Sequence, residues 1–376
     1  MRIVYLHQYF RTPDMAGGTR SYEMARRFVA AGHEVHMVTT DESGQGGRGW
    51  RRDEVDGIQV HTLPVRYDNT MSFVRRLWSF AHFAAVSGRR AAAVRPDVVL
   101  ATSTPLTIAV PAALVKWRRR VPVVFEVRDL WPEMPIAVGA LRNPVLRGLA
   151  RGLERFAYAI SARVVALSPG MAEGVRRVGV APERIAVVPN ACDCDLFDVD
   201  ASVGAAFRAS LPWLGDAPLV VYCGTLGHVN QVDWLAELAG RVRHRTPAHF
   251  LVMGRGVGEE TVRSTAARLG VLDATFHLLP PVPKSEVPAV LSAATVACSL
   301  FAPIEEMEVN SANKFFDALA AGRPVLINYG GWQAEVLDRS GAGVAVDSSD
   351  LDAAADALVA LLDDPERLVA AGRAAG

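Results

Sequence analysis

Short apolar runs alternate with amphipathic helical patterns along most of this 376-residue chain, and this alternation constrains the fold more than any other feature. The runs are continuously apolar, as are parallel strands that helices cover on both faces. Between the first two runs, residues 21–31 repeat apolar side chains at helical spacing and stop before Gly32, a residue typical of helix ends. The pattern predicts doubly wound α/β units, each with a parallel sheet.

The alternation stops near residues 190–218 and then begins again, which predicts two Rossmann-like domains. We place an N-terminal domain at 1–195, a C-terminal domain at 196–350, and a closing helical segment at 351–376 that packs toward the N-terminal domain. The polar, glycine-rich residues 41–54 predict a surface loop. The strand candidates are residues 3–7, 33–39, 58–63, 97–102, 121–127, 162–167 and 185–190, then 218–225, 248–254, 275–279, 294–301, 323–328 and 342–347.

Charge is distributed unevenly between the two halves. Residues 1–190 carry 27 Lys and Arg against 16 Asp and Glu, and the remainder carries 13 against 24. A basic N-terminal half favours contact with an anionic surface, although surface charge that drifts between domains explains the count almost as well. The four cysteines fit neither a zinc site nor a disulfide framework, and no apolar run is long enough to span a membrane. We expect a cytoplasmic protein without a nucleic-acid partner, in at most peripheral contact with a membrane.

A glycine pair, Gly17-Gly18, lies between the first strand candidate and the first helical pattern. Glycine lets a backbone approach a ligand closely, and the start of a helix attracts anions. The pair matches neither a dinucleotide fingerprint nor a Walker A loop. On its own, a tight turn that binds no ligand is the commoner interpretation.

Several segments together resemble the retaining glycosyltransferases of family 4, which have the GT-B fold. They are HQYFRTPDMAGGTRSYEMARRFVAAGHEVHMVT, EVRDLWPE, VVPNACD, YCGTLG, VMGRG, PPVPKSEVPAVLSAATVA and NKFFDALAAGRPVL. The nearest resemblance is to the WbuB-like branch, which builds bacterial surface polysaccharides. It implies two Rossmann-like domains that face each other across a cleft, with the acceptor on the N-terminal side and the donor on the C-terminal side.

The resemblance also implies a reaction. A sugar, expected to be an N-acetylated amino sugar, passes from a UDP-sugar to a glycan, a lipid-linked or a natural-product acceptor. The configuration is retained, and neither a cofactor nor a metal takes part. The resemblance also implies that the acceptor hydroxyl attacks the sugar on the face that the leaving phosphate occupies. The donor's own phosphate then accepts the proton of that hydroxyl.

The diphosphate ligands of the family are only partly present here. Gly17, Gly18, Gly224 and Thr225 would offer backbone groups, and Thr225 and Gln231 stand where relatives carry an Arg and a Lys. Substitute cations are Lys314, Arg255 and Arg20. Lys314 is favoured because a cation near a helix start is unfavourable unless an anion balances it; a solvated lysine is the alternative.

The ribose and sugar positions also depart from the family pattern. Asp317 takes the place of the later of two glutamates, which binds ribose, while Val309 occupies the earlier acidic position. Glu305, with Glu306 and Glu308 nearby, is our candidate for the missing acid, and an exposed loop acid is an equally good interpretation. Asn313 would supply a neutral hydrogen bond, and Val282 would flank the nucleobase. Lys284 is interpreted as a surface residue.

On the acceptor side, Arg128 and Asp129 follow a strand candidate at the expected cleft edge. Arg128 could hold a phosphate or an acceptor anion, and Asp129 could orient a hydroxyl; a structural ion pair is the alternative. Residues 71–90 and 115–120 interleave cations with Trp and Phe, as membrane-surface helices do. Core-facing helices with a solvated basic face are equally compatible with these segments.

Two other functions remain open at this point. A nucleotide-sugar 2-epimerase uses the same two-domain fold, and a non-catalytic nucleotide-sugar-binding protein would tolerate the missing family residues. Release of nucleotide in the presence of an acceptor separates the transferase from both.

Overall fold

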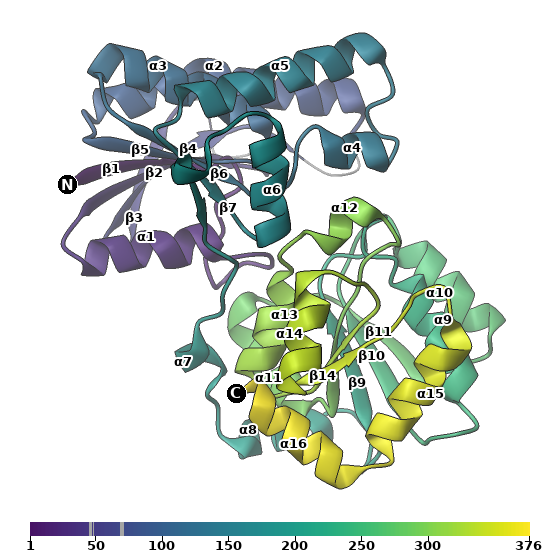
Figure 1. Ribbon diagram of the computed structural model, residues 1–376. Coiled ribbons are helices and arrows are strands. Elements are labelled where there is room, and N and C mark those ends of the chain that lie inside the picture. The colour runs from purple at the N-terminus through teal and green to yellow at the C-terminus, as the bar shows by residue number, and fades with distance from the viewer. Residues whose placement is uncertain (45–46, 48, 68–70) are drawn as a thin grey trace. The chain divides into compact units, whose positions relative to one another are not determined.

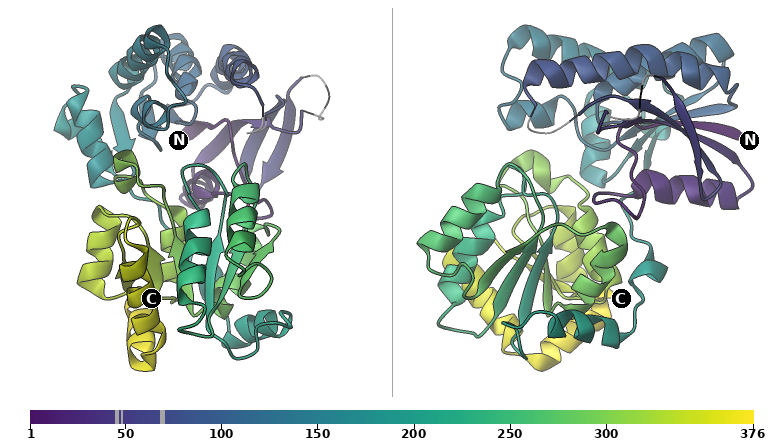
Figure 2. Two further views of the ribbon diagram at one scale, coloured as in Figure 1. Left: turned by 90° about the vertical axis from the view of Figure 1, so that its right-hand side faces the viewer. Right: turned by 180° about the vertical axis from the view of Figure 1, so that it is seen from behind.

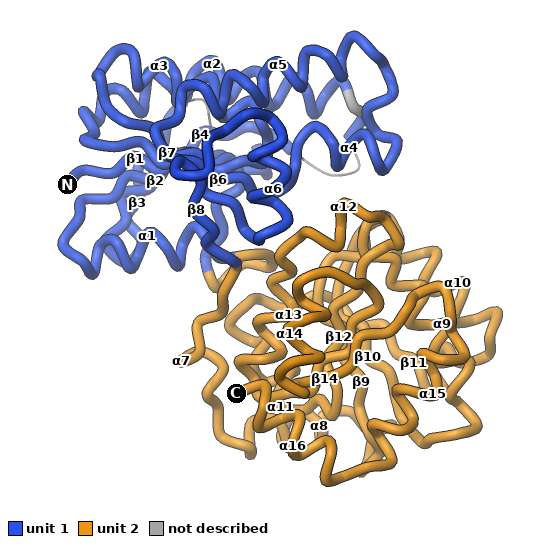
Figure 3. Tube along the Cα trace, in the orientation of Figure 1, with its two compact units in different colours: residues 1–12, 19–189 blue, residues 13–18, 190–376 orange. Residues whose placement is uncertain are grey.

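The computed structural model describes residues 1–44, 47, 49–67 and 71–376 (Figure 1). The chain forms two compact units, one of residues 1–12 and 19–189 and the other of residues 13–18 and 190–376 (Figure 3). Each unit is a mixed α/β body with a mainly parallel sheet, so the doubly wound fold class expected from the sequence is confirmed. After residues 13–18, which belong to the second unit, the chain returns to the first unit and finally leaves it between Pro189 and Asn190. Residues 351–376 belong to the second unit.

The first unit contains a sheet with strand order β3-β4-β2-β1-β5-β6-β7-β8. All neighbouring strands are parallel except β3 and β4. The strands are β1 (Arg2–Leu6), β2 (Glu34–Asp41), β3 (Arg51–Val55), β4 (Ile58–Pro64), β5 (Val98–Thr102), β6 (Val123–Val127), β7 (Arg163–Ala166) and β8 (Ile185–Val187).

Strand β3 corrects the loop expected at residues 41–54. Residues 51–54 belong to β3, which pairs antiparallel with β4, and Asp41 still belongs to β2. Residues 45, 46 and 48 lie outside the described residues. The sequence RRDEV shows no apolar alternation because β3 is an exposed edge strand, and charged side chains protect such an edge from further pairing.

Three long helices of the first unit lie along one face of its sheet, and α1 lies on the opposite face (Figures 1 and 2). Side-chain caps fix two helix starts: Asn143 accepts from Val145 and Leu146 at α5, and Ser168 accepts from Met171 at α6. The helices are α1 (Arg20–Ala30), α2 (Phe73–Ala93), η1 (Leu106–Ile108), α3 (Ala109–Arg119), α4 (Glu133–Ala137), α5 (Pro144–Ile160), α6 (Pro169–Arg177) and η2 (Pro182–Arg184).

The second unit contains an entirely parallel sheet with strand order β11-β10-β9-β12-β13-β14. Helices α9, α10 and α15 cover one face, and α11, α13 and α14 cover the other (Figure 1). Its strands are β9 (Leu219–Cys223), β10 (His249–Met253), β11 (Phe276–Leu279), β12 (Val296–Ser299), β13 (Val325–Ile327) and β14 (Gly343–Ala345).

The remaining helices of the second unit connect these strands and close the chain. Two of them, α15 and α16, form the terminal segment, where α15 packs on α9 and α16 packs on α13. The helices are α7 (Cys194–Phe197), α8 (Ala201–Ala209), α9 (Asp233–Val242), α10 (Glu259–Arg268), η3 (Lys284–Glu286), α11 (Val287–Ala293), α12 (Glu305–Glu308), α13 (Asn313–Ala320), α14 (Trp332–Ser340), α15 (Leu351–Leu362) and α16 (Pro365–Ala375).

A buried histidine pair joins β2 to β4 in the first unit. Arg90 donates from Nε to His61 Nδ1 at 3.0 Å, and the facing nitrogens His61 Nε2 and His36 Nδ1 are 3.0 Å apart. Because Arg90 can only donate, His61 must be neutral, with its proton on Nε2 and directed at His36. His36 then donates from Nε2 to Glu34 Oε1 at 2.8 Å. Burial, assisted by Arg90, lowers the pKa of His61 to about 4.

We predict that this pair makes the first unit sensitive to acid. The unfolded chain protonates His61 near pH 6.5 and the folded chain only near 4, so its stabilising contribution is complete above 6.5 and is lost as the pH falls to about 4. Urea unfolding at pH 7, 5.5 and 4.5 should show the loss of about 2–3 kcal/mol from this site. His61→Gln should be less stable at pH 7 but should lose less on acidification; an unchanged pH dependence would contradict the assignment.

Candidate functional site

The carboxyl end of β9 meets the start of α13 in the second unit. Gly224 directly follows β9 with φ 156°, and a Cβ atom at this position would lie 2.6 Å from Cε of Lys314. Lys314 is the second residue of α13, and its side chain therefore lies against the backbone of Gly224. The structure brings together two residues that the sequence selected separately, and a side chain at 224 would displace the end of the lysine from this position.

Lys314 is a half-buried cation without an anionic neighbour in direct contact. Its Nζ lies 5.4 Å from the ring centroid of Tyr222, and within the described ranges no hydrogen bond or ion pair of its ammonium group is found. Burial lowers the pKa of Lys314 to about 8, although Asp317 acts in the opposite direction. A buried charge without a partner is costly, and such groups concentrate at binding sites.

Asp317 lies one helical turn after Lys314 and already has two partners. Lys284 Nζ is 2.5 Å from its Oδ2 atom, and Cys192 donates from Sγ to Oδ1 at 3.2 Å. The side chains of Lys284 and Asp317 are 12% and 13% exposed, and Lys284 also lies over the ring of Phe197. The interpretation of Lys284 as a surface residue is therefore wrong.

Sequence reasoning also missed Cys192 as part of this cluster. Cys192 lies in the segment VVPNACD, and Lys284 lies in PPVPKSEVP. Both segments carry the family resemblance, and this was the only signal in the sequence that could have pointed to the two residues. Their contacts with Asp317 span 125 and 33 positions of the chain, so no local pattern could reveal them.

The other donor-side candidates follow β9, β10 and β11 or begin α13. Thr225 and Arg255 are exposed; the Thr225 carbonyl accepts from the Tyr222 hydroxyl at 2.9 Å, and the Arg255 carbonyl accepts from the Leu226 amide at 2.9 Å. Val282 and Asn313 are half-buried, after β11 and at the first position of α13. Their roles toward a nucleotide stay predictions.

The acidic helix α12 places Glu305 and Glu308 differently. Glu305 is exposed at the first position of the helix, whereas a Cβ atom on Gly330 would lie 3.5 Å from the carboxylate oxygens of Glu308. Gly330 and Gly331 precede α14, and Trp332 donates from Nε1 to the Asn310 carbonyl at 2.9 Å. Both acids are exposed, and Glu308 is the one that lies beside the glycine pair.

The loop that contains Gly17 and Gly18 belongs to the second unit. Ser285 donates from its amide to the Pro13 carbonyl at 3.1 Å, and Lys284 donates from its amide to the Met15 carbonyl at 3.4 Å. Gly17 has φ 128°, a backbone conformation that favours glycine. The glycine pair thus belongs to a loop that pairs with the segment of Lys284.

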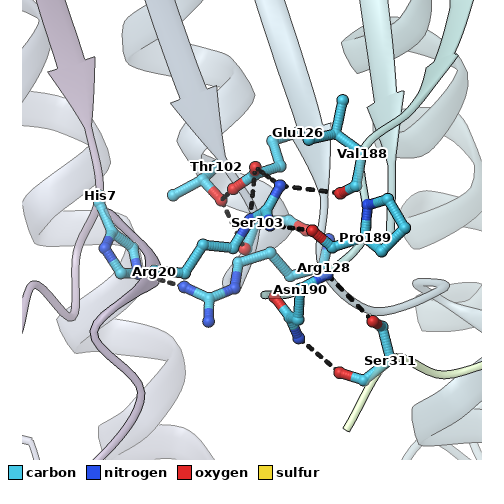
Figure 4. A network of polar contacts seen from close by, with 10 residues as sticks. All are labelled: His7, Arg20, Thr102, Ser103, Glu126, Arg128, Val188, Pro189, Asn190 and Ser311. Carbon is cyan, nitrogen blue, oxygen red and sulfur yellow. Dashed lines mark hydrogen bonds and ion pairs between the residues drawn. The ribbon is translucent and has the colours of Figure 1, made fainter. Parts of the chain in front are cut away.

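Arg20 has a structural role in the first unit (Figure 4). Its guanidinium donates to Glu126 Oε1 at 2.9 Å, to the Pro189 carbonyl at 2.6 Å and to the Val188 carbonyl at 2.9 Å. Thr102 donates to the other oxygen of Glu126 at 2.6 Å, and both charged side chains are buried, at 6% and 1% exposure. All three guanidinium nitrogens of Arg20 thus have partners inside the fold, and its role toward a diphosphate stays a prediction.

Arg128 and Asp129 follow β6 but do not pair with each other within the described residues. Asp129 accepts from the Thr104 hydroxyl at 2.8 Å, while the Arg128 amide donates to Ser103 Oγ at 3.0 Å. The Arg128 side chain points toward His7, with 3.4 Å between Nη1 and Nε2 (Figure 4). The structural ion pair considered as an alternative is absent from this described region.

Two family models cover most of the chain. The model described as "Glycosyl transferase 4-like domain" matches residues 16–191, and that described as "Glycosyl transferases group 1" matches residues 217–364. The chain belongs to glycosyltransferase family 4. The chain also has the GT-B fold, as its solved structural neighbours show. The narrower resemblance to the WbuB-like branch stays a prediction.

Two curated relatives match parts of this chain. A GDP-mannose-dependent phosphatidylinositol monomannoside mannosyltransferase of Mycobacterium tuberculosis is 32% identical over 50% of this chain and 49% of its own. A D-inositol 3-phosphate glycosyltransferase of Segniliparus rotundus is 29% identical over 69% of this chain and 58% of its own. The chain thus spans about half the length of the curated relatives it matches.

Solved structures support the GT-B fold of this chain. Sucrose-phosphate synthase from Thermosynechococcus elongatus has a TM-score of 0.76 at 16% identity, with 100% of this chain and 92% of that chain covered. The Anabaena protein HepE in complex with UDP-glucose has a TM-score of 0.75 at 17% identity, with 100% and 93% covered. At such identities the likeness concerns the fold alone.

We predict that the buried Arg20–Glu126 pair is essential for stability. Arg20→Met would leave the carboxylate of Glu126 buried without its counter-charge, which typically costs about 3–5 kcal/mol of unfolding free energy. Urea unfolding measures the loss. Arg51→Met, which breaks the exposed Arg51–Asp53 pair, serves as the control and should cost less than about 1 kcal/mol. Equal losses in the two variants would refute the assignment.

Proposed function

We propose that this chain transfers a sugar from a nucleotide-diphosphate donor to a hydroxyl group of an acceptor, with retention of configuration. The observation that carries the proposal is Lys314, a half-buried lysine whose ammonium group lacks an anionic contact and whose side chain lies against Gly224 at the carboxyl end of β9. Parallel α/β sheets bind ligands at this edge, and a diphosphate supplies the missing charge. Membership in glycosyltransferase family 4 supports the same reaction class.

The chemistry requires stabilisation of the leaving group. The bond between the sugar C1 and the phosphate oxygen breaks, a bond from C1 to the acceptor oxygen forms, and the acceptor proton passes to a phosphate oxygen. Lys314 would neutralise charge that develops on the diphosphate. Helix α13 begins beside it without a side-chain cap, so its first amides are directed toward the same anion. Independence from metal and the same-face route are supported by the family resemblance only.

Asp317 would bind the ribose hydroxyls of the donor. Its carboxylate can accept several hydrogen bonds, and the weak thiol donor Cys192 is a partner that a hydroxyl can replace. Lys284 would hold the carboxylate in place during this exchange. Val282 and Asn313 would lie along the base and the sugar, and an acid of α12 would contact the transferred sugar.

The donor and acceptor classes are proposed from the resemblance and the relatives. We favour a UDP-linked N-acetylated amino sugar, while the name of the mannosyltransferase relative makes GDP-mannose the main competitor. The relatives named above act on inositol-containing acceptors, one of them a lipid. A glycan, a lipid-linked sugar or a small natural product at the cytoplasmic membrane face would all present the hydroxyl group that the reaction requires.

Peripheral membrane contact is also part of the proposal. None of the described helices is both long and apolar enough to cross a bilayer. On α2, Val74 and Trp78 are 73% and 65% exposed, and on the adjacent α3 Trp117 is 64% exposed. Arg75, Arg76 and Arg118–Arg120 accompany them. Exposed tryptophan with flanking arginine is typical of protein surfaces that bind anionic lipid.

The decisive experiment for the reaction is a donor panel with product analysis. The chain is incubated with UDP-, GDP- and dTDP-sugars, with and without pooled glycan and lipid-linked acceptors. Acceptor-dependent nucleotide release together with a glycosylated product supports the transferase. Epimerised sugar without an acceptor would show the alternative enzyme, and binding without turnover would show a non-catalytic binding protein.

We predict opposite effects of Lys314→Met on binding and on stability. Loss of the charge should weaken UDP or GDP binding about 10- to 100-fold by calorimetry. The ligand-free variant should be more stable at pH 7, by as much as about 3 kcal/mol, because burial lowers the pKa of Lys314 from 10.5 to about 8. In the wild type, stability should rise between pH 8 and 10.5, where the folded state loses this proton first, and the variant should lack that rise.

Lys116→Met is the matched control for this experiment. Lys116 donates to the Ile160 carbonyl at 2.5 Å in the first unit, so its loss should reduce stability and leave nucleotide affinity unchanged. Unchanged nucleotide binding in Lys314→Met would refute the phosphate role of Lys314.

We predict that Trp78→Ser and Trp117→Ser together reduce association with vesicles. Flotation with vesicles that contain phosphatidylglycerol should recover several-fold less of the double variant than of the wild type, because partitioning of tryptophan at the lipid interface is lost. Val369→Ser on α16, which removes another exposed apolar side chain (54% exposed), should float like the wild type. Equal recovery of all three proteins would show that these helices do not bind lipid.

A further inference from the structure

The first unit holds a second cation whose hydrogen-bonding capacity is mostly unused. Arg128 follows β6 at the carboxyl edge of the sheet, and its side chain is half-buried. Among the described residues, the guanidinium of Arg128 contacts Nε2 of His7. No carboxylate of these residues lies within ion-pair distance of the guanidinium. A guanidinium carries five N–H donors in a planar fork, so most of them remain available.

His7 is arranged to position Arg128 without competing for its charge. The ring is buried, and Nδ1 lies 2.7 Å from Ser21 Oγ at the start of α1. Because Arg128 can only donate, Nε2 must accept, and the ring proton must be on Nδ1 and directed at Ser21. Burial, together with the charges of Arg128 and Arg11, holds the pKa of His7 well below its usual value. His7 therefore orients the guanidinium as a neutral group.

The nearby acids of the first unit have other partners. Glu126 pairs with Arg20, Glu42 pairs with Arg11 at 2.5 Å, and Asp129 accepts from Thr104. Arg20 and Arg11 are thus compensated, and Arg128 is the cation of this group that lacks a carboxylate partner among the described residues. An oxyanion from a ligand can fill that position with a pair of parallel hydrogen bonds.

We infer that Arg128 binds an anionic group of the acceptor, so that the chain glycosylates a phosphorylated acceptor in preference to a neutral one. This inference rests on the proposed transferase function and specifies its substrate class. The donor diphosphate is assigned to Lys314 in the second unit, which leaves Arg128 for the other substrate. A phosphomonoester or a phosphodiester, on a soluble sugar or on a lipid, has the planar pair of oxygens that a guanidinium recognises.

Matched acceptors that differ only in the phosphate test this inference. With the donor found in the panel, initial rates are compared for myo-inositol and myo-inositol 1-phosphate, and for undecaprenol and undecaprenyl phosphate in detergent micelles. The phosphorylated member of at least one pair should show a KM about tenfold lower or better, and the pair that responds identifies a soluble or a lipid source. Equal KM values within both pairs, in the presence of turnover, would overturn the inference and leave the proposed function standing.

Variants assign the effect to Arg128. Arg128→Gln should raise the KM for the preferred phosphorylated acceptor about 10- to 100-fold, the range of a lost charge-assisted pair, with donor KM changed less than twofold. Arg128→Lys should keep part of the preference, and His7→Ala should raise the same KM with less effect on kcat. Arg11→Gln removes a nearby but already paired charge and should leave the preference intact.

A loss of UDP or GDP affinity in Arg128→Gln that equals its loss of acceptor affinity would place the donor diphosphate at this residue and overturn the inference. Absence of transfer with every donor and acceptor would instead contradict the proposed function. Thermal unfolding of each variant confirms that it is folded, and Arg128→Gln should be close to wild type because no ion pair is broken.

Discussion

Burial of charge governs both units of this protein, and the Arg20–Glu126 pair shows the constraint most clearly. Neither charge could be buried alone, so the fold supplies three acceptors for the guanidinium and two donors for the carboxylate. These contacts tie the first turn of α1 to β6 and to the residues just after β8. The carboxyl edge of the first sheet, where His7 and Arg128 lie, is built around this fixed point.

Lys314 and Arg20 show how satisfaction of hydrogen bonds separates a structural cation from a binding one. Arg20 is buried and follows the Gly17-Gly18 pair, whereas Lys314 is half-buried and packs against Gly224. Arg20 directs its donors at protein acceptors, whereas Lys314 has a carboxylate, Asp317, only in its wider surroundings. The same distinction applies between Arg11 and Arg128 in the first unit. Whether the N–H donors of a cation have acceptors within the protein therefore separates structural cations from binding ones. Residue type and position in the sequence do not make this distinction.

Much of the fold could be predicted from the sequence because each buried strand is a continuous apolar run. The exception is β3, whose charged sequence follows from its exposed edge rather than from burial. The candidate site was less accessible to sequence reasoning. Gly224 and Lys314 could be chosen from local rules on glycine and helix starts, but the partners of Asp317 and Arg20 could not. Those contacts join residues 33 to 169 positions apart, and only the folded chain brings them together.

The scarcity of lysine gives the low pKa of Lys314 a further consequence. The chain contains three lysines, Lys116, Lys284 and Lys314, since almost all of its cations are arginines. Lys116 donates to a carbonyl and Lys284 is ion-paired, while the pKa of Lys314 is about 8. At mildly alkaline pH about half of the Lys314 side chains are free-base amines, and a free-base amine is a nucleophile. Small amine-directed covalent reagents that reach this sheet edge would therefore modify Lys314 before the other two lysines.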